Sequence, residues 1–216
     1  MQHILVYSDS LSWGIIPRSR LRLPFEQRWP GVMEMSICSN GLRVRVIEDC
    51  LNGRRTVWED PFKPGRNGLA GLAQRIEIHS PLELVILMLG TNDFQSVHEY
   101  NAWHSSQGIL ALVSAIRSAP IEPGMPVPQI LVIAPPAIRT PRGPIAPKFE
   151  GGERKCVGLA VAYQKACEQV GCHFFDAGSV ITSSNVDGVH LDLDQHLALG
   201  HAVSQLVTSL LSGKMP

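Results

Sequence analysis

Apolar residues occur along the chain in two patterns, as short continuous runs and as longer stretches with helical spacing. The most apolar run, LVILML at 84–89, is bounded by Gly90 and predicts a strand that is buried on both faces. Further strands are predicted at 3–7, 43–48, 129–134 and 172–176. Helices are predicted between the strands, at 28–39, 68–79, 103–118, 153–170 and 193–211. This alternation predicts a single α/β domain over residues 1–216, with a parallel sheet covered by helices on both faces.

The segment 135–152 interrupts this alternation. It carries prolines at 135, 136, 141, 144 and 147, which makes it too proline-rich for a helix. It is also longer than an ordinary turn, and long ordered loops in compact domains often serve as lids or binding loops. A surface excursion or an oligomer contact is an equally good interpretation of this segment.

Charge and cysteine content narrow the class of protein. Lys+Arg and Asp+Glu both total 19, so the 216-residue chain has no net charge, and we expect no nucleic-acid partner. The apolar runs are too short to cross a bilayer, and the first residues show no basic stretch followed by an apolar one, so we expect neither an export signal nor a membrane partner. The five cysteines are scattered without a Cys-x-x-Cys pair. We therefore expect reduced thiols in a cytoplasmic protein, with neither a metal site nor a disulfide framework.

Ser10 is a candidate nucleophile because it follows the first predicted strand in the sequence Ser-Asp-Ser-Leu at 8–11. Ligands of open α/β sheets bind at the carboxyl ends of the strands. A serine hydroxyl attacks efficiently only when a neighbouring base removes its proton, and a serine considered alone is usually a turn or cap residue. The Gly-x-Ser-x-Gly elbow is absent, which argues against the α/β-hydrolase arrangement.

Asp187 and His190 are the candidate partners of this serine. Their spacing of three residues lets the carboxylate reach the imidazole, fix its tautomer and stabilise its charged form. A lone Asp-x-x-His is weak evidence, but this pair follows the fifth predicted strand. It therefore belongs to the same sheet edge as Ser10 and Asn92.

Acyl transfer also needs hydrogen-bond donors for the developing oxyanion. Three candidates follow predicted strands: the backbone N–H of Ser10, the side-chain amide of Asn92 in Gly-Thr-Asn-Asp at 90–93, and the backbone N–H of Gly53. Glycine suits the last place because it lets the backbone approach a substrate closely. The alternatives are a turn or helix-cap role for Asn92 and a simple turn role for Gly53.

These blocks resemble the SGNH (GDSL-type) hydrolases, which carry Gly-Asp-Ser-Leu, a glycine block, Gly-x-Asn-Asp and Asp-x-x-His in this order. The present chain departs from that pattern at Ser8, where the family usually has glycine. The segments 9–14, 88–93, 149–153 and 174–180 are similar to the bacterial arylesterase/acyltransferase branch. The resemblance implies a three-layer α/β/α flavodoxin-like fold with a five-stranded parallel sheet.

The resemblance further implies a serine esterase that hydrolyses short-chain or aryl esters through an acyl-serine. Its partners would be a small-molecule ester and either water or an alcohol acceptor, and it would need no cofactor. Homo-oligomers with a hydrophobic substrate channel are also implied. Trp13, Ile15, Ile16 and the proline-rich segment offer apolar walls near Ser10 and favour small uncharged acyl or aryl groups. Trp13 and Ile16 are the candidate substrate-binding residues, although both also fit a core.

Several alternatives stay open. An enzyme of the same fold could act on another ester, as a carbohydrate acetylesterase, a thioesterase or a lysophospholipase. A non-catalytic binding protein on this fold is a second class, since fold does not fix function. A nucleotide-binding module is disfavoured, because the chain has neither a phosphate-binding loop nor a dinucleotide fingerprint.

Overall fold

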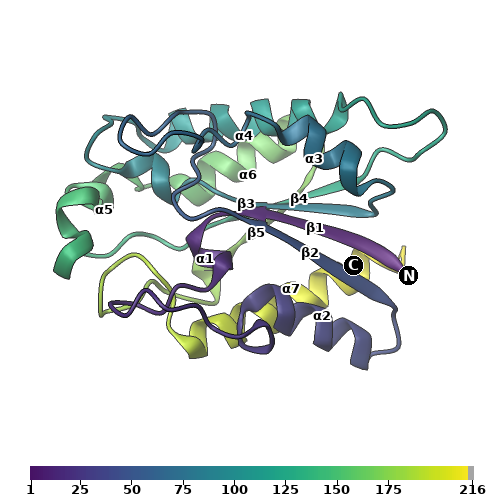
Figure 1. The fold of residues 1–216 in the computed structure, drawn as a ribbon, viewed down its shortest axis with the longest axis horizontal. Coiled ribbons are helices and arrows are strands. Elements are labelled where there is room, and N and C mark those ends of the chain that lie inside the picture. The colour runs from purple at the N-terminus through teal and green to yellow at the C-terminus, as the bar shows by residue number, and fades with distance from the viewer. Residues whose placement is uncertain (214–216) are drawn as a thin grey trace.

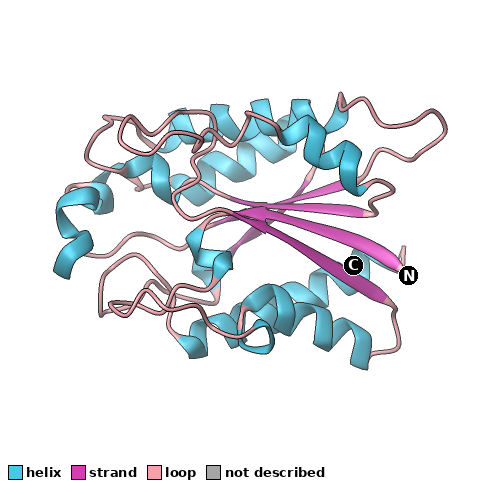
Figure 2. Cartoon of the chain, viewed as in Figure 1, coloured by secondary structure: helices cyan, strands magenta, loops and turns pink. Residues whose placement is uncertain are grey.

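The computed structural model describes residues 1–213 and contains a parallel sheet of five strands in the order β2-β1-β3-β4-β5 (Figure 2). The strands are β1 (Gln2–Ser8), β2 (Val44–Cys50), β3 (Leu84–Met88), β4 (Gln129–Ala134) and β5 (His173–Asp176). Each one lies within two residues of its predicted bounds. The five-stranded parallel sheet expected from the sequence is therefore confirmed.

Helices cover both faces of the sheet, which gives the expected three layers (Figure 1). One face carries α3 (Leu72–His79), α4 (Ala102–Arg117) and α6 (Leu159–Val170), and the other carries α2 (Trp29–Ser39) and α7 (Leu193–Leu211). The shorter elements are α1 (Ser10–Trp13), α5 (Gly152–Lys155) and the 3-10 helices η1 (Phe25–Gln27), η2 (Thr91–Phe94), η3 (Gly143–Phe149) and η4 (Ala177–Ser179). Within residues 1–213, no helix combines the length and apolar character needed to cross a membrane.

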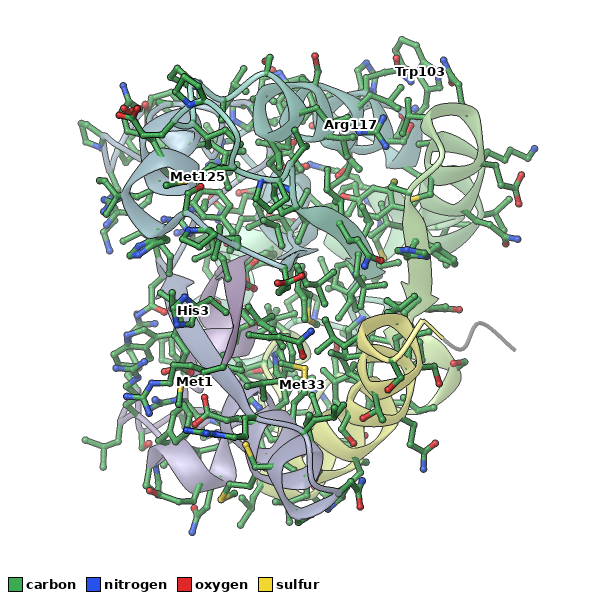
Figure 3. All side chains as sticks on the ribbon, turned by 90° about the vertical axis from the view of Figure 1, so that its right-hand side faces the viewer. Met1, His3, Met33, Trp103, Arg117 and Met125 are labelled. Carbon is green, nitrogen blue, oxygen red and sulfur yellow. The ribbon has the colours of Figure 1, made fainter. Side chains whose placement is uncertain are left out.

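Each face of the sheet has its own apolar core. Along β1, Leu5 and Tyr7 belong to the core under α3, α4 and α6, whereas Ile4 and Val6 belong to the core under α2 and α7. Because successive side chains of a strand point to opposite faces, a strand buried on both sides is apolar at every position. Figure 3 shows Met33 inside the layer formed by α2 and α7.

The structure differs from the predicted helices where glycines adopt the left-handed conformation. The expected helix 153–170 is split into α5 and α6, because Gly158 has a φ of 81° and caps α6. Helix α3 begins four residues later than expected, after Gly71 with a φ of 77°. The proline-rich segment contains the 3-10 helix η3, which was not expected; Pro144 lies in its first turn and Pro147 inside it.

The chain connections create a crevice at the carboxyl edge of the sheet. The strand that follows β1 in the chain, β2, pairs with one edge of β1. The chain then crosses over, so that β3 pairs with the other edge of β1. Ligands in open α/β sheets bind where the connections diverge in this way. The loops after β1, β2 and β3 therefore meet at one place.

Candidate active site

Ser10 is positioned by the turn between β1 and α1. Asp9 caps this short helix, and its Oδ1 accepts a 2.9 Å hydrogen bond from the Leu11 N–H. Ser10 is therefore the first residue of α1, where backbone N–H groups have no partner within the helix. Among the described residues, no acceptor receives a hydrogen bond from the Ser10 N–H, and the residue is 7% exposed.

Ser8, which replaces the usual glycine, is built into the end of β1. It is fully buried, and it pairs with Met88 of β3 in the sheet. Its hydroxyl donates a 2.6 Å hydrogen bond to the Met88 carbonyl and lies 2.6 Å from Ser12 Oγ. Ser12 in turn accepts a 2.9 Å hydrogen bond from the Trp29 indole N–H. A side chain fits at this position because the backbone of Ser8 is that of an ordinary strand. The serine adds hydrogen bonds two residues before Ser10.

Asp187 and His190 form a tight pair in the loop after η4. Asp187 Oδ2 lies 2.7 Å from His190 Nδ1, and Oδ1 accepts 2.9 Å hydrogen bonds from the N–H groups of Val189 and His190. Burial alone would raise the pKa of Asp187, but these hydrogen bonds and the imidazole hold it below its ordinary value. The carboxylate stays ionised near neutral pH and can stabilise a protonated imidazole.

The proline-rich segment holds this loop through its backbone. The N–H groups of Arg139 and Arg142 donate to the carbonyls of Gly188 and Asp187, at 2.8 and 3.0 Å. The two backbones lie very close together at Gly188, which has a φ of 82°. A Cβ at this position would lie 2.5 Å from the Thr140 carbonyl oxygen. The imidazole is therefore positioned by two segments, its own loop and the one that follows β4.

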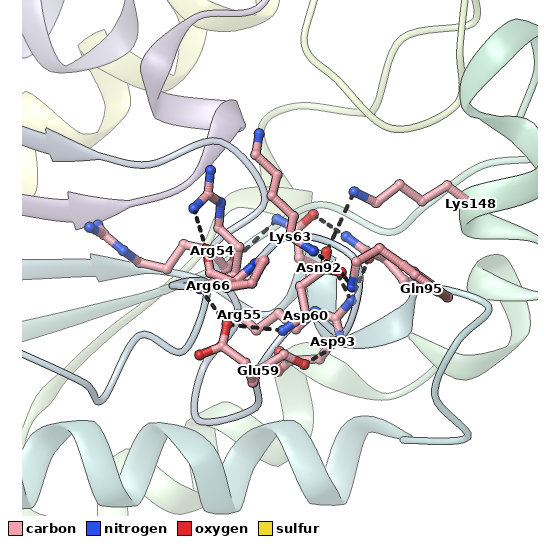
Figure 4. Close-up of polar contacts among 12 residues, drawn as sticks. Arg54, Arg55, Glu59, Asp60, Lys63, Arg66, Asn92, Asp93, Gln95 and Lys148 are labelled. Atoms are coloured by element: carbon pink, nitrogen blue, oxygen red, sulfur yellow. Dashed lines mark hydrogen bonds and ion pairs between the residues drawn. The ribbon is translucent and has the colours of Figure 1, made fainter.

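Asn92 lies in η2, after β3, at the centre of a buried polar network (Figure 4). Its Nδ2 donates to Asp9 Oδ2 at 2.8 Å and to the Arg54 carbonyl at 3.1 Å, and its Oδ1 accepts from Gln95 Nε2 at 2.8 Å. Both N–H bonds of the amide are thus engaged. An oxyanion in the cavity would compete with the Arg54 carbonyl for one of them.

Gly53 lies in the loop after β2 with a φ of 85°. Arg54 fastens this loop to the sheet, because it donates to the Ser8 carbonyl at 2.9 Å and to Asp49 Oδ1 at 2.7 Å. Its guanidinium also lies 3.8 Å from the centre of the Tyr7 ring. Within residues 1–213 the Gly53 N–H has no hydrogen-bond acceptor, so it is available to a ligand.

One cavity of about 70 Å³ brings these groups together. It is lined by Ser10, Gly53, Asn92 and His190, together with Ile15, Arg20, Asn52, Lys63, Ile145, Lys148 and Phe149. A second cavity of about 60 Å³ is also lined by His190, Ile15 and Ile145. The described residues show no direct hydrogen bond between Ser10 and His190, although both side chains border the first cavity. Such bonds often tighten only when a substrate is bound.

Trp13 and Ile16 lie outside the walls of both cavities. Trp13 is half-buried, with the guanidinium of Arg22 4.8 Å from its ring centre. The apolar wall that α1 and its following turn provide is Ile15, which lines both cavities. Within the described part of the chain, no group of three or more His, Cys, Asp or Glu side chains is placed to hold a metal ion.

Residues 9–202 match the GDSL-like Lipase/Acylhydrolase family. The chain belongs to this family. Among solved structures, an aryl esterase from M. smegmatis is 35% identical, with 97% of this chain and 100% of that chain covered and a TM-score of 0.91. A carbohydrate acetylesterase from Sinorhizobium meliloti is 33% identical at the same coverage and TM-score. No curated protein sequence matches the chain.

Membership of the GDSL-like family and the esterase structures support a carboxylic ester hydrolase. Within the family blocks, sequence reasoning gave no role to Asp9 or to Asp93. Asp9 orients Asn92, whereas Asp93 accepts hydrogen bonds from the Thr56 N–H, the Thr56 hydroxyl and the Ser105 hydroxyl and so ties η2 to its neighbours. Gln95 was missed as well; its place three residues after Asn92, on one turn of chain, was the only available signal.

Proposed function

We propose that this protein is a serine esterase in which Ser10 is the nucleophile and His190 is the general base, oriented by Asp187. His190 Nε2 takes the Ser10 proton as Oγ attacks the ester carbonyl. The tetrahedral oxyanion is held by the N–H groups of Ser10 and Gly53 and by the Asn92 amide. The protonated imidazole then gives its proton to the departing alcohol, which leaves an acyl-serine.

Water resolves the acyl-serine in a second, similar step. His190 removes a proton from water, the hydroxide oxygen attacks the acyl carbon, and Ser10 leaves with the proton that the imidazole returns. An alcohol in place of water would give transesterification instead. This second outcome predicts a measurable yield of new ester from vinyl acetate and an alcohol in buffer, and a product that is only acid would reject it.

One observation carries the proposal. Ser10, Gly53, Asn92 and His190 come from four separate segments of the chain, yet they line the same cavity, and the carboxylate of Asp187 lies 2.7 Å from the imidazole. A chance surface cluster has no reason to combine a hydroxyl, an oriented imidazole and two unpaired backbone N–H groups. This combination is what acyl transfer requires.

The apolar side of the cavity supports a short-chain or aryl ester, because Ile15, Ile145 and Phe149 supply an apolar wall beside Ser10. A carbohydrate acetylesterase is the second candidate, favoured by the S. meliloti structure. A panel of acetylated sugars and aryl acetates would separate the two activities.

The test is the Ser10→Ala variant, compared with Ser39→Ala, an exposed serine at the end of α2. We expect hydrolysis of p-nitrophenyl acetate to fall by about 10³-fold or more for Ser10→Ala and to stay unchanged for the control. A fluorophosphonate probe should label the unmodified protein at Ser10, as located by peptide mass spectrometry. If Ser10→Ala kept half of the activity, the assignment would be wrong.

A further inference from the structure

The cavity that holds Ser10 is strongly cationic, although the whole chain carries no net charge. Arg20, Lys63 and Lys148 line it, and the second cavity adds Arg18 and Arg142. Among the described residues, the single carboxylate that borders either cavity is Asp187, and it is already bonded to His190. The composition does not reveal this local excess of positive charge, because the five cationic residues come from three separate segments of the chain.

Most of these cations have no carboxylate partner. Within residues 1–213, no Asp or Glu oxygen lies within 4 Å of the charged groups of Arg18, Arg20, Lys63 or Arg142. Elsewhere near the same sheet edge, arginines are paired; Arg54 lies 2.7 Å from the carboxylate of Asp49, for example. The charges of these four residues are therefore not neutralised by ion pairs within the described part of the chain.

Lys148 is only partly neutralised. Its Nζ lies 3.8 Å from Asp60 Oδ2, but the same oxygen lies 3.3 Å from Arg55, so one carboxylate serves two cations. Figure 4 shows Lys63 and Lys148 near this Arg55–Asp60 pair. Burial and the positive charges of neighbours that include Lys63 and Arg20 lower the pKa of Lys148. An anion bound among these groups would relieve their mutual repulsion.

Two of the arginines are held in an unusual backbone conformation. Arg18 and Arg20 have φ values of 64° and 57°, and they are the only residues other than glycine with positive φ in the described chain. Their loop is closed by a bridge between Ile15 and Arg22 and by a 2.8 Å hydrogen bond from the Ile16 N–H to the Leu21 carbonyl. Strain of this kind is concentrated at functional sites, and here it borders both cavities.

The cavity wall has one further unsatisfied group. Asn52 lines the cavity, and its Oδ1 is buried without a hydrogen-bond partner among the described residues. Buried polar atoms are rarely left without a partner, so an orphaned acceptor in a ligand cavity indicates a donor supplied by the ligand. A substrate hydroxyl would satisfy it.

We propose that the natural ester carries an anionic group, such as a carboxylate, sulfate or phosphate, outside the scissile bond, and that Arg20, Lys63 and Lys148 bind it. This inference rests on the proposed esterase function. It replaces the sequence-based expectation that uncharged acyl and aryl groups are favoured. The unpaired cations concentrate anionic esters at the cavity and hold the anion while Ser10 attacks.

Two matched ester pairs test this inference and locate the anion. The first pair is meta-acetoxybenzoate and meta-acetoxybenzamide, which differ in the charge of the alcohol part. The second pair is mono-p-nitrophenyl glutarate and its carboxamide, which differ in the charge of the acyl part. In at least one pair we expect the anionic ester to have a kcat/KM about tenfold above that of the neutral one at low salt. The preference should shrink in about 0.5 M NaCl, because salt screens exposed charges.

Charge-removing variants identify the groups responsible. Arg20→Gln, Lys63→Gln and Lys148→Gln should each lower the anionic-to-neutral ratio of kcat/KM several-fold. The matched control is Lys165→Gln, which removes the same charge from an exposed position on α6 that lines neither cavity, and it should leave the ratio unchanged. A ratio at or below one in both pairs of esters would overturn the inference.

A binding measurement separates this inference from the esterase proposal. Ser10→Ala, titrated by calorimetry with both matched pairs, should bind the anionic ester more tightly than the neutral one in at least one pair. Equal binding within both pairs would overturn the anion site whether or not the unmodified protein hydrolyses esters. Anion-selective binding without hydrolysis of any ester in the panel would instead reject the esterase function and retain the anion site.

Discussion

The amide of Asn92 donates a 2.8 Å hydrogen bond to Asp9, a carboxylate that is completely buried. The Asp9 carboxylate also caps α1, because it accepts a hydrogen bond from the Leu11 N–H. Burial raises the pKa of Asp9 to about 7, even though both hydrogen bonds favour its charged form. One acidic residue thus sets the orientation of the proposed oxyanion donor and the start of the helix that carries the proposed nucleophile.

We expect Asp9→Asn to lower kcat about tenfold or more. The oxygen of the new amide can still accept the Leu11 N–H, but its NH₂ group would face the NH₂ group of Asn92 and could not accept a hydrogen bond from it. KM should change less, since the ground-state cavity is retained. The matched control is Asp176→Asn, which alters another capping aspartate, one that accepts the Gly178 N–H at 2.8 Å. Steady-state kinetics on an aryl acetate would check both variants; equal kcat values would contradict a positioning role for Asp9.

Ser8→Gly would restore the residue that the family usually has at this position. We expect a loss of about 1–2 kcal/mol in the free energy of unfolding, because the buried hydrogen bond to Met88 disappears and glycine loosens the strand. Urea denaturation would measure the change. Turnover should stay at the level of the unmodified protein, whereas a clear gain in kcat would show that the Ser8 hydroxyl hinders Ser10.

Gly90 separates β3 from η2 with a φ of 122°. A Cβ at this position would lie 2.3 Å from the buried Tyr163 hydroxyl, which is itself held by Ser105 at 2.6 Å. Gly90→Ala should therefore cost about 3 kcal/mol or more of folding stability.

Gly171→Ala is its control, because Gly171 also has a positive φ, of 63°, but a Cβ there would meet nothing within 4 Å. We expect that variant to cost only about 1 kcal/mol. Similar losses in thermal or urea unfolding for the two variants would show that the contact with Tyr163 matters little.

We expect His196 to make the folding stability of the protein decrease in acid. It is fully buried; its Nδ1 accepts a 3.3 Å hydrogen bond from the Trp29 N–H, and burial lowers its pKa from 6.5 to about 4. Since the unfolded chain takes up this proton near pH 6.5 and the folded chain only near pH 4, acid favours unfolding over this interval.

His196→Asn keeps an acceptor for Trp29 but cannot titrate. The stability advantage of the unmodified protein over this variant should shrink by about 3 kcal/mol between pH 7 and pH 4. Urea unfolding of both proteins at a series of pH values would measure it. An advantage that does not vary with pH would contradict the assignment.

The sheet was predictable because its central strands β1, β3 and β4 are largely buried and so stand out as apolar runs. The bounds predicted for β4 and α7 agree with the structure at both ends. The helix expected at 153–170 was wrong as one continuous element. Its apolar spacing continues across the break, but Gly158 adopts a left-handed backbone that spacing does not reveal.

The residues of the site that belong to short sequence motifs could be predicted. Those brought to the cavity by the course of a loop could not. The cavity brings Ser10, Asn92 and His190 to one place, as expected from strands that end at the same edge. The predicted apolar walls were Trp13, Ile15, Ile16 and the proline-rich segment. Of the three residues only Ile15 lines the two cavities, because the direction of the turn after α1 decides which neighbouring side chain faces inward. The cationic lining was invisible, since Arg20 and Lys148 are distant in sequence.

The segment after β4 supplies Ile145 and Phe149 to the cavity and, through Arg139 and Arg142, also supports the backbone that carries His190. Reshaping that wall to admit bulkier esters would therefore disturb the proton-transfer machinery at the same time. An engineer who seeks a broader substrate range would do better to start from Ile15, which follows α1 and does not belong to the segment that supports the imidazole.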